Sequence, residues 1–279
     1  MKYALVLAVF FSIPFAAVSQ RRVTGTLIEH RNFASKFVMP RQVDVWLPPR
    51  YHSAPAQRYA VLYAHDGQNL FDPYTAFIKV DWGLDETLTQ LIAEDKVQEV
   101  IVVGIWNTPK RRQEYMPEKA AATFLGEPVQ SDNYLRFLVE ELKPFIDSTY
   151  RTRPEQSHTF IMGSSMGGLI SLYAICEYPH IFGGAACLST HFPAADGAVI
   201  EYMKSHLPDP ATHKIYFDYG TETLDAQYEP YQQRADAVMR QRGFIEGKNW
   251  ITRKFPGDEH SERAWRKRVH IPLLFLLGK

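Results

Sequence analysis

The chain has 279 residues, enough to bury a large core, and one α/β domain of this size is ordinary. Its 31 basic and 31 acidic side chains cancel and no basic block stands out, so the sequence favours neither nucleic acid nor an anionic membrane surface as a partner. A small uncharged or mixed substrate is compatible with these counts. No repeat or low-complexity tract interrupts the chain, which predicts one domain over residues 20–279.

Residues 1–19 have the pattern of a secretory signal peptide. Lys2 precedes an apolar stretch over residues 3–11, and small residues at 16–19 permit cleavage after Ser19. An uncleaved membrane-associated helix is the alternative, but the segment is short for one. The remainder has no uninterrupted apolar run of membrane-spanning length. We therefore predict a secreted or periplasmic protein without a stable membrane anchor after cleavage.

The expected elements alternate along the chain in the manner of an α/β fold. Strands are predicted over residues 23–29, 42–47, 60–64, 99–106, 158–162, 184–188, 214–219 and 250–255. Apolar residues at helical spacing predict helices around 84–92, 134–145, 228–242 and 262–276, the second bent or ended near Pro144. These elements indicate a mostly parallel sheet of about eight strands with helices on both faces. The first two strands lack an intervening helix, which predicts an antiparallel hairpin at the sheet edge.

The most informative motif lies at residues 163–167, which read Gly-Ser-Ser-Met-Gly and fit the pattern GxSxG. The β-prone run 159–162 precedes it, and apolar residues at helical spacing follow over 169–175. This is how a tight strand-to-helix turn presents a nucleophilic serine, with glycines removing the clashes of the turn. The alternative is an ordinary glycine-rich loop before a helix. We predict that Ser165 is a nucleophile.

A serine hydroxyl needs a histidine as general base, and that histidine needs a carboxylate. In the α/β-hydrolase order of serine, acid and histidine, His260 follows the last expected strand and is the predicted base, although alone it would read as a solvated or helix-capping residue. The loop before it offers Asp218, Glu222 and Asp225. Asp218 falls within a strand and is the least favoured. Asp225 is preferred because it stands at the far side of the turn, where its carboxylate can point back across the strand ends, and Glu222 is the reserve. A helix N-cap is the other use of Asp225.

Acyl transfer also needs two backbone donors for the developing oxyanion. The amide of Met166 directly follows the nucleophile at a helix N-terminus. The second donor is expected in the loop at 65–72, where Gly67 would turn the chain into the pocket and place the Gln68 amide. The alternative is a plain Asp-Gly turn.

Aromatic faces suit sugar rings and phenolic acyl groups, although most aromatic side chains belong to the core. Arg111 and Arg112 could hold a carboxylate or phosphate, but a solvated pair is expected. The candidate substrate-binding residues are Asn69, Phe71, Trp82, Trp106, His191 and Trp265.

Neither a metal nor an organic cofactor is predicted. There is no HExxH motif, and His260 has no second histidine at helical spacing. Cys176 and Cys187, the only two cysteines, lack metal-ligand spacing; they could approach each other across one helix-strand connection, but two small buried apolar residues are preferred to a disulfide.

Several segments together resemble the putative esterase family, which includes esterase D, feruloyl, acetylxylan and enterochelin esterases, and mycolyltransferases. The similarity spans about residue 25 to the C-terminus. It is carried by residues 65–72, 102–105, 111–117, 163–168 and 257–260 together with Trp265.

The resemblance implies an α/β-hydrolase fold with Ser165 as nucleophile, His260 as base, and the amides of Gln68 and Met166 as the oxyanion hole. Family members often carry the acid at the position of Thr223, so here the sequence departs from the pattern.

We therefore predict a serine esterase that forms an acyl-enzyme and hydrolyses carboxylic esters, with acetyl or feruloyl esters of carbohydrates as the favoured small-molecule substrates. A siderophore esterase and an acyltransferase are alternatives within the same chemistry. A catalytically silent binding protein with this fold is the alternative from another class.

Overall fold

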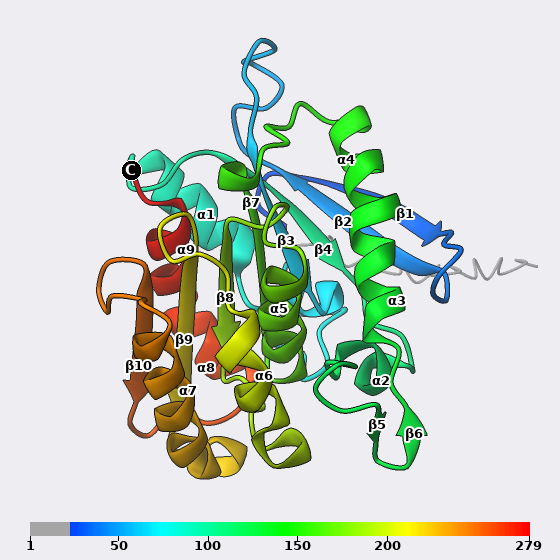
Figure 1. Ribbon diagram of the computed structural model, residues 1–279. Coiled ribbons are helices and arrows are strands. Elements are labelled where there is room, and N and C mark those ends of the chain that lie inside the picture. The colour runs from blue at the N-terminus through cyan, green and yellow to red at the C-terminus, as the bar shows by residue number, and fades with distance from the viewer. Residues whose placement is uncertain (1–22) are drawn as a thin grey trace, which may run out of the picture.

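The computed structural model describes residues 23–279, so the signal peptide expected at 1–19 lies outside the described residues. Eight strands form one sheet in the order β1-β2-β4-β3-β7-β8-β9-β10 (Figure 1). The strands are β1 (Thr26–Phe33), β2 (Arg41–Leu47), β3 (Ala60–His65), β4 (Val100–Ile105), β7 (Thr159–Ser164), β8 (Gly184–Leu188), β9 (Lys214–Gly220) and β10 (Trp250–Phe255).

The sheet confirms the predicted architecture. Strand β1 pairs with β2 in an antiparallel edge hairpin, and β2 is antiparallel to β4. The other neighbours, from β4 through β10, are parallel. Their carboxyl ends therefore meet along one edge, where ligands bind in open α/β sheets.

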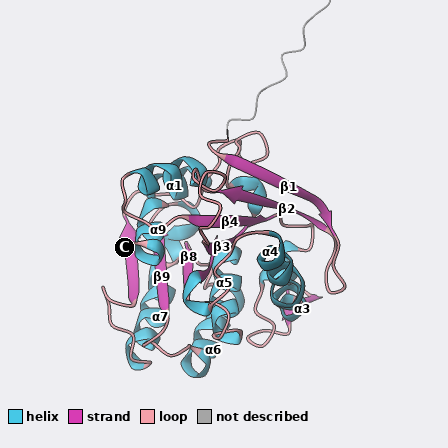
Figure 2. Cartoon of the chain, turned by 90° about the horizontal axis from the view of Figure 1, so that it is seen from above, coloured by secondary structure: helices cyan, strands magenta, loops and turns pink. Residues whose placement is uncertain are grey.

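Helices cover both faces of the sheet, with α1 and α9 on one side and α3 to α7 on the other (Figure 2). The helices are α1 (Leu84–Ala93), α2 (Arg111–Tyr115), α3 (Ser131–Arg136), α4 (Lys143–Thr149), α5 (Met166–Glu177), α6 (Ala198–His206), α7 (Glu229–Gln241), α8 (Glu262–Arg268) and α9 (His270–Leu277).

Each face of the sheet has its own apolar core because successive side chains of a strand point to opposite faces. In β3, Val61 and Tyr63 pack with helices α3 to α7, whereas Leu62 packs with α1 and α9. Helix α5 lies between the sheet and its neighbours and is buried almost all round. The nucleophile motif at its start is therefore fixed by the core.

The structure differs from the sequence expectations at three places. The helix predicted around 134–145 to bend or end near Pro144 does not end there. It runs from α3 through a π-helical segment (Phe137–Leu142) into α4, so the type of turn changes just before Pro144. The helix predicted over 262–276 is divided at Val269, because Pro272 cannot donate to the preceding turn.

The third difference is a small hairpin of β5 (Thr123–Phe124) and β6 (Glu127–Pro128), which was too short to leave an apolar pattern.

Cys176 and Cys187 are both buried and free, which confirms the preference for two small buried residues. None of the described helices has both the length and the apolar character needed to cross a bilayer.

Candidate active site

Ser165 stands at a strained turn between β7 and α5. Its backbone has φ 59° and ψ −122°, a conformation that side chains other than glycine rarely adopt. A Cβ on Gly163 would lie 2.6 Å from the carbonyl oxygen of Gly167, so glycine is required for the turn to close. The Ser165 N–H donates to the carbonyl of Leu188 in the next strand (2.9 Å). The sequence motif thus forms the tight turn that was predicted for it.

His260 and Asp225 form a short hydrogen bond between the loops that follow β9 and β10. Nδ1 of His260 lies 2.5 Å from Oδ1 of Asp225, and the Asp225 side chain is fully buried. The other carboxylate oxygen accepts bonds from the Gly220 N–H and the Ser189 hydroxyl, both at 2.7 Å. Burial alone would raise the pKa of Asp225, but the bonds from His260, Ser189 and Gly220 lower it overall. Asp225 is therefore held as a carboxylate against the imidazole.

Glu222, the reserve candidate for the acid, is exposed at the outer side of the same loop. Its N–H donates to the carbonyl of Asp258 (3.0 Å), which joins the loop after β9 to the loop carrying His260. The His260 N–H donates in turn to the hydroxyl of Thr223 (2.9 Å). The structure therefore brings Asp225, and not Glu222, to the histidine.

A buried polar network supports Asp225 from behind. The Ser189 hydroxyl, which donates to Asp225, accepts bonds from Nε1 of Trp265 (3.0 Å) and from Arg268 (2.9 Å). Arg268 pairs with Asp218 at 3.0 Å, and both side chains are almost completely buried. Asp218, which lies within β9, thus neutralises the arginine. Because each buried polar group has a partner, the network fixes one position for the acid.

Tyr228 links the histidine to the nucleophile. Its ring lies edge-on to the His260 ring, with centroids 5.6 Å apart, and Trp265 packs edge-on to His260 from another side at 5.1 Å. The Tyr228 hydroxyl lies near the Ser165 side chain and 2.6 Å from Nδ1 of His191. The loops that carry Ser165, His260 and Asp225 therefore meet around one aromatic side chain.

The loop after β3 approaches the nucleophile turn from the other side. A Cβ on Gly67 would lie 2.6 Å from the carbonyl carbon of Gly104, so only glycine allows this loop to pack on β4. A Cβ on Gly167 would lie 3.4 Å from a carboxylate oxygen of Asp66, which places the two turns in contact. Within residues 23–279, neither the Gln68 nor the Met166 N–H donates a hydrogen bond. Both predicted oxyanion donors are thus available.

Arg111 is held in place and is not the solvated residue that was expected. Its guanidinium makes two bonds to Asp66, each 2.7 Å long, and only 28% of its side chain is exposed. Asn107 donates a third bond to the same carboxylate (2.6 Å). The guanidinium keeps the pKa of Asp66 low despite burial, and burial lowers the pKa of the adjacent His65 to about 3. The ion pair of Arg111 with Asp66 therefore holds the loop that carries Gln68 in place.

The six residues predicted to bind substrate have different surroundings. Phe71 and Trp82 lie in the core, 2% and 1% exposed, a placement that favours packing. Trp106 donates to Asp44 (2.6 Å). Asn69, 8% exposed, accepts from the Phe77 N–H. Trp265 packs against the His260 ring, and His191 packs against Tyr228. Of the six residues, these two therefore lie nearest to the proposed base.

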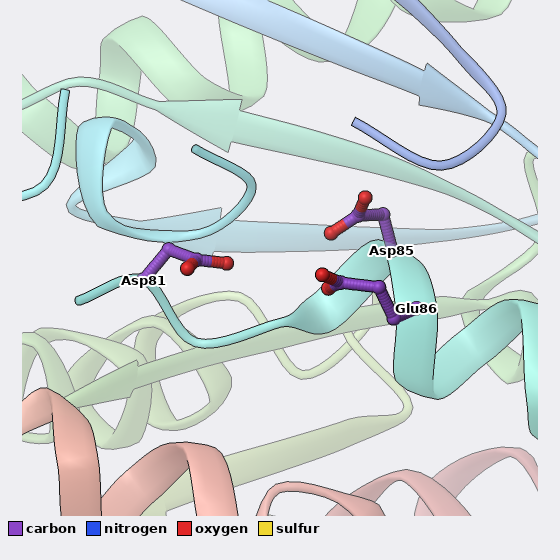
Figure 3. Close-up of side chains that lie close together, drawn as sticks. All are labelled: Asp81, Asp85 and Glu86. Atoms are coloured by element: carbon purple, nitrogen blue, oxygen red, sulfur yellow. The ribbon is translucent and has the colours of Figure 1, made fainter. Parts of the chain in front are cut away.

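Three carboxylates, of Asp81, Asp85 and Glu86, lie close together at the start of α1 (Figure 3). Their oxygen atoms are within 4.8 Å of one another, the only such grouping with potential metal ligands among residues 23–279. Arg266 of α8 pairs with Asp81 (2.8 Å) and Glu86 (3.2 Å). Burial, together with Glu86, raises the pKa of Asp85 to about 8. We interpret the group as an ion-pair site that ties α8 to the loop before α1.

Sequence reasoning missed Tyr228, Ser189 and the Asp66–Arg111 pair. Tyr228 immediately precedes a helix, Ser189 follows a strand and Arg111 lies on a short helix, so none carries a local motif. The one available signal was position, since Ser189 and Tyr228 both follow strands at the carboxyl edge of the sheet.

Comparison with known proteins identifies the family. The model of the family described as "Putative esterase" matches residues 35–271. The chain belongs to this family. The resemblance seen in the sequence is thereby confirmed.

Curated relatives and solved structures extend along most of the chain. The uncharacterized protein YbbA of Bacillus subtilis is 24% identical over 264 residues, covering 91% of this chain and 97% of its own length. A ferulic acid esterase structure is 18% identical with a TM-score of 0.69, covering 91% of this chain and 98% of that one. The enterobactin esterase FES of Shigella flexneri is 18% identical with a TM-score of 0.67, covering 90% of this chain and 59% of that one. These two structures share the fold of this chain.

Proposed function

We propose that the protein is a serine esterase in which Ser165 is the nucleophile, His260 the general base and Asp225 the acid. The observation that carries the proposal is the 2.5 Å bond from His260 to a fully buried Asp225, at the same sheet edge as the strained turn of Ser165. A buried carboxylate on Nδ1 leaves Nε2 of the imidazole as the basic nitrogen and stabilises its protonated form.

The reaction follows from these roles. His260 takes the proton of Ser165 as the hydroxyl attacks the ester carbonyl, and the amides of Gln68 and Met166 donate to the resulting oxyanion. His260 then gives the proton to the departing alcohol, which leaves an acyl group on Ser165. A water molecule, activated by the same histidine, releases the acid. Neither a metal nor an organic cofactor takes part in this scheme.

The favoured substrates are acetyl or feruloyl esters of carbohydrates, which the fold shared with a ferulic acid esterase supports. A siderophore ester is the second candidate, because the fold is also shared with an enterobactin esterase. Transfer of the acyl group to a sugar, or binding without catalysis, would use the same fold. We further propose that residues 1–19 direct export to the periplasm or the medium. Turnover of a panel of acetylated, feruloylated and siderophore esters, with a competing alcohol present, distinguishes these substrates and reactions.

Replacing the nucleophile tests the mechanism itself. Ser165→Ala should lower p-nitrophenyl acetate turnover by roughly 10⁴-fold to 10⁶-fold, the usual loss for a triad serine. It should also abolish labelling by a fluorophosphonate. The matched control is Ser164→Ala, since Ser164 adjoins the nucleophile but has its side chain buried at the end of β7. If Ser165→Ala is labelled as fast as the wild type, the proposed mechanism is wrong.

A further inference from the structure

His191 is fixed beside the nucleophile at both its backbone and its ring. Its N–H donates to the carbonyl of Ser165 (3.2 Å). Nδ1 of its ring lies 2.6 Å from the hydroxyl of Tyr228, which also lies near the Ser165 side chain. Tyr228 is itself only 2% exposed at the start of α7. The Tyr228 phenol thus lies beside both Ser165 and His191.

The second ring nitrogen of His191 has no such partner. Within residues 23–279, Nε2 makes no hydrogen bond, and it is not among the polar atoms closed off from solvent. The imidazole is neutral near pH 7, because burial, and then the charges of His260 and Arg111, lower its pKa to about 4 against the opposing effect of Asp225. A neutral imidazole offers one donor and one acceptor nitrogen. His191 therefore presents one open hydrogen-bonding group to solvent beside the nucleophile.

We propose that Nε2 of His191 binds a hydroxyl group of the substrate's alcohol part, and that Tyr228 positions the ring for this contact. The inference rests on the proposed esterase function and names the substrate class of that site, esters of polyols and sugars. When Tyr228 donates to Nδ1, Nε2 carries the proton and donates; when Nδ1 donates to Tyr228, Nε2 accepts. A hydroxyl satisfies either arrangement, whereas an alkyl or aryl group satisfies neither.

Reach and selectivity both favour this contact. His191 lies next to the nucleophile, because its N–H donates to the Ser165 carbonyl and its ring bonds to Tyr228. We therefore expect Nε2 to contact a hydroxyl on the carbon adjacent to the one that bears the ester oxygen. A site built to hydrogen-bond a substrate hydroxyl discriminates against the analogue that lacks it, since its polar group is then left without a partner. His191 is thus a specificity residue, and Tyr228 is a positioning residue.

The test uses two esters that differ by one hydroxyl, cyclohexyl acetate and trans-2-hydroxycyclohexyl acetate. The readout is the ratio of their kcat/KM values, from which a general loss of activity cancels. One neutral hydrogen bond should give the wild type about a fivefold to tenfold preference for the hydroxylated ester. His191→Asn keeps a polar atom at the place of Nδ1 but none at that of Nε2, so its ratio should fall to about 1. His191→Gln, which places its amide near Nε2, should retain part of the preference, and Tyr228→Phe should lose most of it.

The outcomes separate this inference from the proposed function. A wild-type ratio near 1, or an unchanged ratio in His191→Asn, overturns the role of His191 while leaving the esterase intact. If that unchanged ratio comes with an equal loss on both esters, His191 serves the nucleophile and not the substrate. Failure of the wild type to hydrolyse either ester, with no fluorophosphonate labelling of Ser165, refutes the proposed function itself.

Discussion

Gly220 at the end of β9 has almost no room for a side chain, and replacing it by alanine should displace the histidine from the acid. A Cβ there would lie 2.1 Å from the carbonyl oxygen of Asp258 and 3.1 Å from a carboxylate oxygen of Asp225. Ordinary contacts begin near 3.4 Å, so the two loops must separate by more than about 1 Å. The Asp258 carbonyl also accepts two N–H bonds from the loop after β9, and His260 follows two residues later.

The size of the effect follows from this displacement. A misplacement of about 1 Å costs roughly 10²-fold in rate, and loss of the orienting acid costs roughly 10⁴-fold. We therefore expect Gly220→Ala to lower kcat/KM for p-nitrophenyl acetate by about 10²-fold to 10⁴-fold. Overpacking should also lower the free energy of unfolding by about 1–3 kcal/mol.

Gly257→Ala is the matched control in the neighbouring loop. Its φ of +83° makes alanine strained, by about 1–2 kcal/mol, but no atom lies within 4 Å of the added Cβ. This variant should lose stability and keep most of its activity. Thermal unfolding and steady-state kinetics on both variants separate the two effects. A folded Gly220→Ala with activity within about threefold of the wild type would contradict the reasoning.

Two further predictions concern carboxylates. Asp225→Asn should reduce kcat/KM by roughly 10⁴-fold, whereas Glu222→Gln should have little effect; the reverse result in parallel assays would reassign the acid. Asp85→Asn should become more stable relative to the wild type as pH rises from about 4 to about 8. The folded pKa of Asp85 is raised to about 8 by burial and by Glu86. Between about pH 4 and pH 8, ionisation of Asp85 therefore favours the unfolded wild type, by about 1.4 kcal/mol for each pH unit well within this range. Urea unfolding at several pH values measures the difference, and a constant difference would show that Asp85 ionises normally in the folded protein.

The sequence predicted the sheet well because its strands are apolar runs bounded by turn residues. The segments 184–188 and 250–255 coincide with β8 and β10, and the edge hairpin formed as expected. The π-helical segment was not predictable, because a pattern of 3.6-residue spacing describes the α-helix and carries no signal for a single wider turn.

At the candidate site, residues within a motif were predictable and those joined only by the fold were not. Ser165 and His260 stand at recognisable positions, and the choice of Asp225 agrees with its contact to His260. Tyr228 is different, because its partners Ser165 and His191 belong to loops far away in the sequence. Such a contact is created by strand order, and local patterns carry no information about it.

Because its two thiols are unpaired and buried, the protein is suited to labelling through a cysteine introduced at its surface. Since Cys176 and Cys187 are the only cysteines of the chain and both lie inside the core, maleimide reagents should find no target on the native surface. A single cysteine introduced at the exposed Phe77 or Leu224 would then carry a fluorophore at a known position. Without a disulfide to protect, such a labelled protein can be prepared and assayed under reducing conditions.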